Sequence, residues 1–191
     1  MPPEPTSRPS YSLRDARPDE AATVGAVVSA AYAQFQPDYP PESWERFIRM
    51  VGEAGGHFER AEVIVAEDDG VIIGTVMFYP DGSTSGQGEW PEGWAGVLRL
   101  AVLPSYRGHR VARALMDEVV RRCREAGIPR LALHTTDFMA VAKAMYERMG
   151  FVRDESFDFV PRSGIHAYGY VLDVGMAADG EPIGGSQRMA T

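Results

Sequence analysis

The chain has 191 residues, 45% of them hydrophobic and 24% charged, a composition typical of one globular domain and not of a fibrous or disordered protein. Its formal net charge is −8 and its pI is about 5.0, and because an acidic surface repels phosphate groups, nucleic-acid binding is disfavoured. No apolar run approaches the roughly 20 residues of a membrane-spanning helix, so no membrane association is expected.

The cysteine content points to the cellular compartment. Cys123 is the only cysteine, so no intramolecular disulfide can form, which favours a reducing, cytoplasmic location. Its apolar neighbours at helical spacing predict a small buried side chain rather than a nucleophile.

The two ends of the chain differ from the middle. Residues 1–10 are rich in proline and are predicted to be disordered or loosely attached. Residues 175–191 are rich in Gly, Ala and Ser and are predicted to form a flexible tail. The domain itself is therefore expected over residues 11–174.

The first part of the domain is predicted to contain one strand and two helices. Residues 12–15 suit a short strand. Pro18-Asp19-Glu20 opens a helix, because proline and acidic residues favour the first helical turn, and this helix is expected to continue through Ala31. A second helix is predicted from Pro41 or Glu42 to Glu53.

The middle of the domain is predicted to be mostly strand. A hairpin is indicated by 63–66 and 71–79, joined at the turn Asp68-Asp69-Gly70. Residues 80–95 form a long glycine-rich loop, and loops of that length are often functional. The next strand, 96–103, ends at Pro104.

Helices and strands alternate in the last part. The i, i+3, i+4, i+7 apolar pattern predicts a helix over 108–126, stopped by Gly127. A strand over 131–135 and a helix over 138–149, capped by Gly150, follow. Two more strands are predicted: one begins at residue 151, and the last spans 165–174. The resulting order, β-α-α-β-β-β-α-β-α-β-β, indicates an α+β fold.

The turn before the helix at 108–126 is a candidate anion site. The first turn of a helix carries unpaired N–H groups and a partial positive charge, which together favour a phosphate. Four basic residues gather at this helix start: Arg107, His109, Arg110 and Arg113. The small residues Gly108 and Ala112 would let a bulky anion approach the backbone. The alternative is a solvated basic helix start without a ligand.

At this turn the sequence resembles a known family. Arg107-Gly-His-Arg-Val-Ala112 is similar to the Arg/Gln-x-x-Gly-x-Gly/Ala signature of the GCN5-related N-acetyltransferase (GNAT) superfamily, and residues 100–104 and 114–115 also fit it. Ala144-Met-Tyr-Glu-Arg-Met-Gly-Phe151 resembles the family's Tyr-x-x-x-Gly-Phe segment. The resemblance covers residues 11–173. It implies a GNAT-like mixed, mostly antiparallel central sheet with a splayed parallel strand pair, flanked by helices.

The resemblance also implies roles for individual residues. Backbone amides of 107–112 would hold the pyrophosphate of CoA, and the strand edge at 100–102 would pair with the pantetheine, in a gap between that strand and the strand at 131–135. The amide of Val102 would polarise the thioester carbonyl. Tyr146 would protonate the departing thiolate. The implied cofactor-binding residues are Leu100, Ala101, Val102, Arg107, Gly108, His109, Arg110, Val111, Ala112 and Arg113.

Two positions depart from the family pattern. Arg110 stands where the signature has glycine, which makes close approach and an unusual backbone angle less easy. Met139 stands where many relatives have an asparagine seven residues before the tyrosine. A side-chain contact to the pantetheine is therefore expected to be missing.

The function implied by the resemblance is N-acetylation. An acetyl group would pass from acetyl-CoA, the co-substrate, to a primary amine of a small molecule or peptide by direct attack in a ternary complex. The alternative is a non-catalytic acyl-CoA-binding sensor or regulatory module. No metal is expected, because the four histidines and one cysteine show no ligand spacing. A homodimer is possible, since dimers are common in the family.

The catalytic acid and base are less sharply indicated. In the helix predicted over 138–149, Phe138, Val141 and Met145 form one face, and Tyr146 lies about 100° away, where it could face a ligand. The alternative for Tyr146 is packing beside the sheet. The candidates for the general base are Glu89, Glu92, His134, His166 and water.

Two groups of aromatic residues are candidates for the acceptor pocket. Tyr32, Phe35 and Tyr39 follow the first long helix, where the family builds part of its acceptor site. Trp90 and Trp94 flank Glu92 in the long loop. Each group could instead be core packing or a loop anchor.

Overall fold

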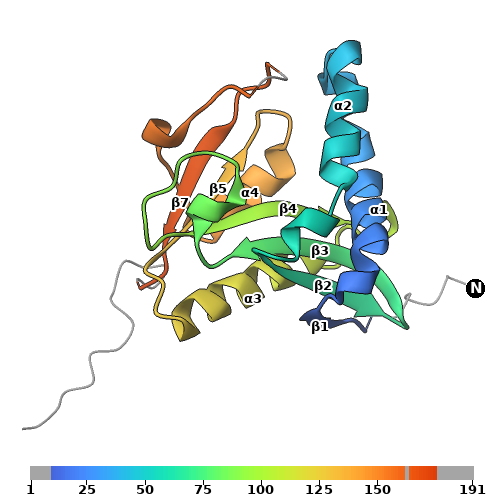
Figure 1. The fold of residues 1–191 in the computed structure, drawn as a ribbon, viewed down its shortest axis with the longest axis horizontal. Helices are drawn as coiled ribbons and strands as arrows, with labels where there is room; N and C mark the ends of the chain where they lie inside the picture. The colour runs from blue at the N-terminus through green and yellow to red at the C-terminus, as the bar shows by residue number, and fades with distance from the viewer. Residues whose placement is uncertain (1–9, 162–163, 176–191) are drawn as a thin grey trace, which may run out of the picture. The chain divides into compact units, whose positions relative to one another are not determined.

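The structure, a computed structural model, describes residues 10–161 and 164–175 (Figure 1). These residues divide into two compact units. Of the described residues, the first unit comprises 10–79 and 97–118, and the second comprises 80–96, 119–161 and 164–175. The predicted terminal segments, 1–10 and 175–191, lie almost entirely outside the described residues. The extent of the domain over 11–174 stays a prediction.

The first unit is built on four strands in the order β1-β2-β3-β4. They are β1 (Ser12–Asp15), β2 (Glu62–Asp68), β3 (Val71–Tyr79) and β4 (Ala95–Val102), whose first two residues belong to the second unit. β1 pairs antiparallel with β2, and β2 with β3. The hairpin between β2 and β3 turns at Asp69 and Gly70, within the predicted turn, and their φ angles of 46° and 78° are those of a type I′ turn.

Two helices pack side by side in the first unit (Figure 1). They are α1 (Ala21–Tyr32) and α2 (Pro41–Gly52); the predicted start at Pro18 is a 3₁₀ turn that leads into α1. Glycines allow the close packing, because a Cβ on Gly25 would lie 1.9 Å from the carbonyl oxygen of Gly52.

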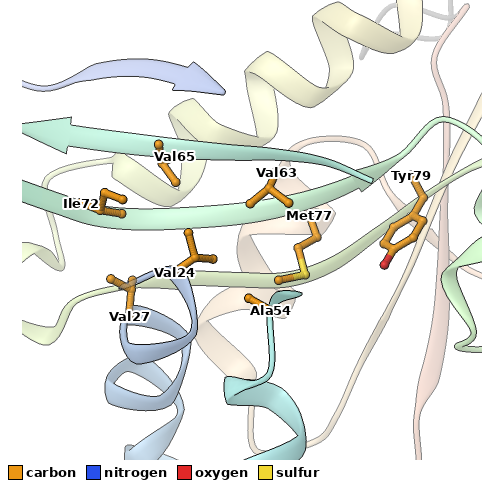
Figure 2. Close-up of a cluster of buried hydrophobic side chains, with 8 residues drawn as sticks. All are labelled: Val24, Val27, Ala54, Val63, Val65, Ile72, Met77 and Tyr79. Carbon is orange, nitrogen blue, oxygen red and sulfur yellow. The ribbon is translucent and has the colours of Figure 1, made fainter. Parts of the chain in front are cut away.

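The core of the first unit lies between these helices and the sheet (Figure 2). Its buried side chains come from α1, from the segment after α2, and from β2 and β3. They are Val24, Val27, Ala54, Val63, Val65, Ile72, Met77 and Tyr79. This packing fixes the ends of α1 and α2 relative to the strands.

The third helix, α3 (Val111–Glu125), begins three residues later than predicted. Gly108 and Arg110 have φ angles of 82° and 63°, which no helical residue adopts, so the apolar periodicity overestimates the helix at this end. A Cβ on Gly74 of β3 would lie 3.0 Å from Val111 Cγ1 and 3.3 Å from Leu115 Cδ1, so the start of α3 packs closely on that strand.

The end of α3 follows the prediction. Gly127 has a φ of 67°, and the amide of Ile128 donates to the carbonyl of Cys123 at 2.9 Å, the bond that closes a Schellman motif. Cys123 is fully buried, as expected for a small apolar side chain.

The described part of the second unit contains three strands in the order β5-β7-β6. They are β5 (Arg130–Thr135), β6 (Val152–Arg153) and β7 (Tyr168–Asp173), and β7 pairs antiparallel with both neighbours. The last strand thus begins three residues later than predicted. The predicted loop at 80–95 contains a 3₁₀ turn over Gly82–Ser85.

Helix α4 (Ala140–Arg148) buries a different face from the one predicted. Val141 is 87% exposed, whereas Tyr146 is 6% exposed. Because α4 begins at Ala140, Phe138 precedes the helix, and the side of Tyr146 is the one turned inward. The predicted packing face through Phe138, Val141 and Met145 is therefore wrong.

The order of helices and strands matches the prediction along the whole described chain. The α+β class, with a mostly antiparallel sheet and flanking helices, is confirmed. The splay between residues 98–103 and 131–135 concerns both units and stays a prediction.

Candidate active site

The turn between β4 and α3 has an unusual backbone. After the 3₁₀ turn Pro104–Tyr106, Gly108 and Arg110 both adopt left-handed conformations, with φ of 82° and 63°. The residues from Arg107 to Arg110 are exposed. Turns that alternate in this way point successive amides outward and make anion-binding concavities.

The amides of this turn have no internal acceptor. The first backbone bond into α3 runs from the Ala114 amide to the Arg110 carbonyl at 2.9 Å. In the part of the chain that the structure describes, the amides of residues 108–113 donate to no protein oxygen. They point from the positive end of a 15-residue helix, so an anion here would gain both hydrogen bonds and the helix dipole.

The basic side chains at this turn divide into two pairs. Arg107 donates from Nη2 to the Ala31 carbonyl at 3.1 Å, near the end of α1, and Arg113 forms an ion pair with Asp117 at 2.9 Å. His109 and Arg110 are exposed and have no hydrogen bond or ion pair within residues 10–161 and 164–175. Two of the four predicted cations are thus held by the fold, and the other two have no protein partner among the described residues.

The segment that resembles Tyr-x-x-x-Gly-Phe is a helix stop that fixes Tyr146. Gly150 has a φ of 93°, which lets the amide of Phe151 donate to the Tyr146 carbonyl at 3.0 Å. The rings of Tyr146 and Phe151 pack with centroids 5.7 Å apart. The motif therefore positions the tyrosine backbone and ring, while its role as an acid stays a prediction.

Two buried hydroxyl groups at the end of β5 have no hydrogen-bond partner. They are Oγ1 of Thr135 and Oγ1 of Thr136, the only such side-chain atoms in the described residues. A buried, unpaired hydroxyl is costly, so each marks a place where a ligand or water would be stabilised. The sequence contained no signal for them, because threonine in a strand is ordinary.

His134 lies inside an aromatic cluster of the second unit. Its ring stacks on Trp90 at 4.4 Å and meets Phe159 edge-on at 4.7 Å. Its Nε2 lies 2.8 Å from the carbonyl oxygen of Phe157, and because a carbonyl only accepts, Nε2 carries the hydrogen. Burial lowers the pKa of His134, so the ring is neutral and Nδ1 bears the lone pair.

The other base candidates lie in more open positions. Glu89 and Glu92 are exposed. His166 lies 3.2 Å from Asp158 and stacks on Tyr168. Of the side chains predicted as bases, only His134 therefore combines burial with a nitrogen fixed in its acceptor form.

The aromatic candidates for the acceptor pocket pack against their own neighbours. Tyr39 stacks on Phe47 at 4.3 Å and meets Trp44 at 5.5 Å. Tyr32 contacts Phe35 at 5.8 Å and Phe47 at 6.0 Å. Trp90 packs on His134, as described above. Each group thus anchors a loop or helix end.

The sequence did not point to a polar cluster in the first unit. Arg99 has a φ of 53° within β4 and donates to the carbonyls of Met50 and Glu53 at the end of α2. Nδ1 of His57 is hydrogen-bonded to the hydroxyl of Tyr79, at the end of β3. These partners are far apart in sequence, so no local pattern brings them together.

The described residues contain neither a candidate membrane span nor a candidate metal site. No helix among them is long and apolar enough to cross a membrane. Nor do three or more of their His, Cys, Asp or Glu side chains gather as metal ligands.

Comparison with known proteins links the chain to one family. The model of the acetyltransferase (GNAT) family matches residues 25–151. Similar solved structures include PaiA N-acetyltransferase from Thermoplasma acidophilum in complex with coenzyme A, with 16% identity, 84% of this chain and 98% of that chain covered, and a TM-score of 0.65.

Two further structures have the same fold. An acetyltransferase of the GNAT family from Staphylococcus aureus is 14% identical to this chain, with a TM-score of 0.64. The match covers 86% of this chain and 99% of that chain. A GNAT family acetyltransferase from Brucella melitensis, in complex with acetyl-CoA, is 23% identical to this chain, with a TM-score of 0.57. The match covers 86% of this chain and 88% of that chain.

Proposed function

Because the chain belongs to the acetyltransferase (GNAT) family, we propose that it transfers the acetyl group of acetyl-CoA to a primary amine of a small molecule or peptide. The observation that carries this proposal is the run of unpaired amides over residues 108–113, at the start of α3. A diphosphate is the group that such a turn suits best. Two of the similar structures hold coenzyme A or acetyl-CoA.

The proposed cofactor contacts follow from the backbone of this turn. The left-handed angles at Gly108 and Arg110 direct the amides outward, and the small side chains of Gly108 and Ala112 leave room for the diphosphate. His109 and Arg110 add positive charge beside it. Residues 100–102 are proposed to pair with the pantetheine amides, as an added strand would.

The reaction needs a free amine and a stabilised leaving group. An ammonium ion has no lone pair, so a proton must leave the acceptor before its nitrogen attacks the thioester carbon. We assign the proton on the departing thiolate to Tyr146 and polarisation of the carbonyl to the amide of Val102. Direct attack is favoured over an acyl-enzyme, since Cys123 is fully buried.

The structural features of His134 make it our candidate for the general base. Its Nε2–H is engaged by the Phe157 carbonyl, and its Nδ1 has no partner among the described residues. The lowered pKa keeps this nitrogen unprotonated near neutral pH. Loss of the acidic limb of the pH–rate profile in His134→Gln would support the assignment, and an unchanged profile would contradict it.

Two further parts of the proposal concern the protein's setting. A chain with one cysteine suits a reducing compartment, so we propose a cytoplasmic location. We also propose that the protein works as a homodimer, which light scattering of the purified protein would test.

The proposed function is tested by measuring acetyl-CoA consumption with a panel of amines. Transfer to at least one amine is expected, as is binding of CoA by calorimetry, with pantetheine binding far more weakly because it lacks the diphosphate. Equal binding of CoA and pantetheine would contradict the diphosphate site. Binding of CoA without transfer to any amine would favour the alternative of a non-catalytic acyl-CoA-binding module.

A further inference from the structure

An arginine in the middle of β4 is partly buried without a carboxylate partner. Arg99 donates from Nη2 to the Met50 carbonyl at 2.8 Å and from Nη1 to the Glu53 carbonyl. Throughout residues 10–161 and 164–175, no Asp or Glu forms an ion pair with it. In a chain with a net charge of −8, a half-buried cation whose hydrogen bonds go to backbone carbonyls and not to a carboxylate is unusual.

The residues on either side of Arg99 fix its surroundings. Leu98 packs against the cluster that contains Tyr79, at the end of β3. Ala101 belongs to the cluster formed with the ends of α1 and α2, on which Tyr32 packs. Arg99 therefore lies between the last turns of both helices and the end of β3, entirely within the first unit.

The titratable groups near the guanidinium include two neutral ones, Tyr32 and His57, and one carboxylate, Glu53. Burial raises the pKa of Tyr32 to about 12, and the charge of Arg99 opposes this shift. The pKa of His57 falls to about 4 because of burial and the nearby positive charges of Arg99 and Arg60. The Glu53 carboxylate is turned to the amide of Gly55, from which it accepts a hydrogen bond at 3.0 Å.

Two kinds of donor remain unused. A guanidinium has five N–H groups, and only two bonds from Arg99 are made to the protein. The hydroxyl of Tyr32 has no hydrogen bond within the described residues, and its ring is held by Phe35 and Phe47. A rigid aromatic hydroxyl and the open side of a guanidinium suit the two oxygens of a carboxylate.

We propose that Arg99 and the Tyr32 hydroxyl bind a carboxylate of the acceptor, so that the preferred substrates are amines that also carry a carboxylate, such as amino acids. This inference rests on the proposed acetyl transfer and names the substrate class of that reaction. The carbonyls at the end of α2 hold the guanidinium in place, and the bound carboxylate accepts its remaining hydrogen bonds.

The test compares amino acids with the amines that they give on decarboxylation. The pairs are phenylalanine with 2-phenylethylamine and lysine with cadaverine. For each pair, kcat/KM is measured by acetyl-CoA consumption, and binding to the CoA-loaded protein is measured by calorimetry. We expect the wild type to favour the carboxylated member by roughly 10- to 100-fold, the range of hydrogen bonds to a charged group.

Variants separate recognition from folding. Arg99 also caps α2, so Arg99→Gln is expected to lose stability, but the preference within a pair is a ratio that cancels a loss of folded protein. The ratio should fall to near one in Arg99→Gln, fall by several-fold in Tyr32→Phe, and fall to an intermediate value in Arg99→Lys, which keeps the charge but loses the fork of donors. Comparing each variant with the wild type also cancels the intrinsic reactivity of the two amines.

The outcomes are distinguishable from those of the proposed function. Failure of every carboxylated amine to bind, equal binding within both pairs, or a ratio unchanged by Arg99→Gln overturns the carboxylate site. CoA affinity and transfer to amines without a carboxylate are measured in the same samples and report on acetyl transfer by itself.

Discussion

Replacing the unpaired hydroxyl of Thr135 by a methyl group should stabilise the free protein. Thr135 is 2% exposed, and its Oγ1 has no partner. Burying such a hydroxyl costs about 1–3 kcal/mol, and Thr135→Val removes that cost while keeping the branched shape and the strand preference. At about 2–4 °C per kcal/mol for a domain of this size, the melting temperature should rise by about 2–12 °C.

The same change should weaken binding of the cofactor. If the hydroxyl is satisfied by acetyl-CoA, its loss removes one hydrogen bond, worth about 0.5–1.5 kcal/mol. The dissociation constant for CoA would then rise by about 2- to 12-fold. Thermal melts with and without CoA measure both effects: the variant should melt higher alone and gain less from saturating CoA.

Thr75→Val is the matched control for this experiment. Thr75 is also fully buried, but its hydroxyl donates to the Ile64 carbonyl at 3.1 Å. The same substitution there should lower the melting temperature and leave CoA binding unchanged. A Thr135→Val protein that melts lower than the wild type would refute the reasoning, since the hydroxyl would then have a stabilising partner. Unchanged affinity for CoA would refute its contact with the cofactor.

Three further predictions concern the turn, the acid and a buried histidine. Arg110→Gly should stabilise the free protein by up to about 1 kcal/mol, because glycine adopts φ of 63° without strain. Gly108→Ala should destabilise it by a similar amount and weaken CoA binding. Denaturant melts measure the stabilities, and calorimetry measures CoA binding. Tyr146→Phe should lower kcat by about 100-fold or more with little change in the KM for acetyl-CoA, and unchanged turnover in steady-state kinetics would reject the acid role. The pKa of His57 lies at about 4, below its ordinary value of 6.5, so its neutral form stabilises the fold above pH 6.5, and this contribution, on the order of 2 kcal/mol, is lost as the pH falls toward 4. Urea melts across this range should show a shallower pH dependence in His57→Gln, and parallel curves for variant and wild type would contradict the assignment.

Local sequence rules predicted the elements that depend on local geometry. The turn at Asp69-Gly70 and the helix ends at Gly127 and Gly150 each require a left-handed residue, and each has one in the structure. Such positions are readable because only a few residues adopt that conformation at low cost. The order of strands and helices follows from these stops and from the apolar periodicity between them.

Features that depend on packing over long sequence distances were not predictable. The bond from Arg99 to Glu53 joins residues 46 apart in sequence, and the contact between His57 and Tyr79 joins residues 22 apart. The buried face of α4 also differs from the predicted one. Apolar residues lie on several sides of this helix, so the sequence does not show that Val141 is exposed. The sequence of a weakly amphipathic helix does not predict which side is buried.

Arg110 shows what the phosphate-binding signature specifies. The residue departs from the glycine of the motif, yet its φ of 63° is the angle that glycine would supply at lower cost. The turn therefore keeps the direction of its amides at a strain of about 1 kcal/mol, and it places a positive charge beside the proposed diphosphate site. The strain is present without a ligand and so lowers the stability of the fold, whereas a charge near a bound diphosphate would add up to about 1 kcal/mol to affinity and make it more dependent on salt. The signature is thus a statement about backbone geometry, and the side chain at this position sets how much of the binding is electrostatic.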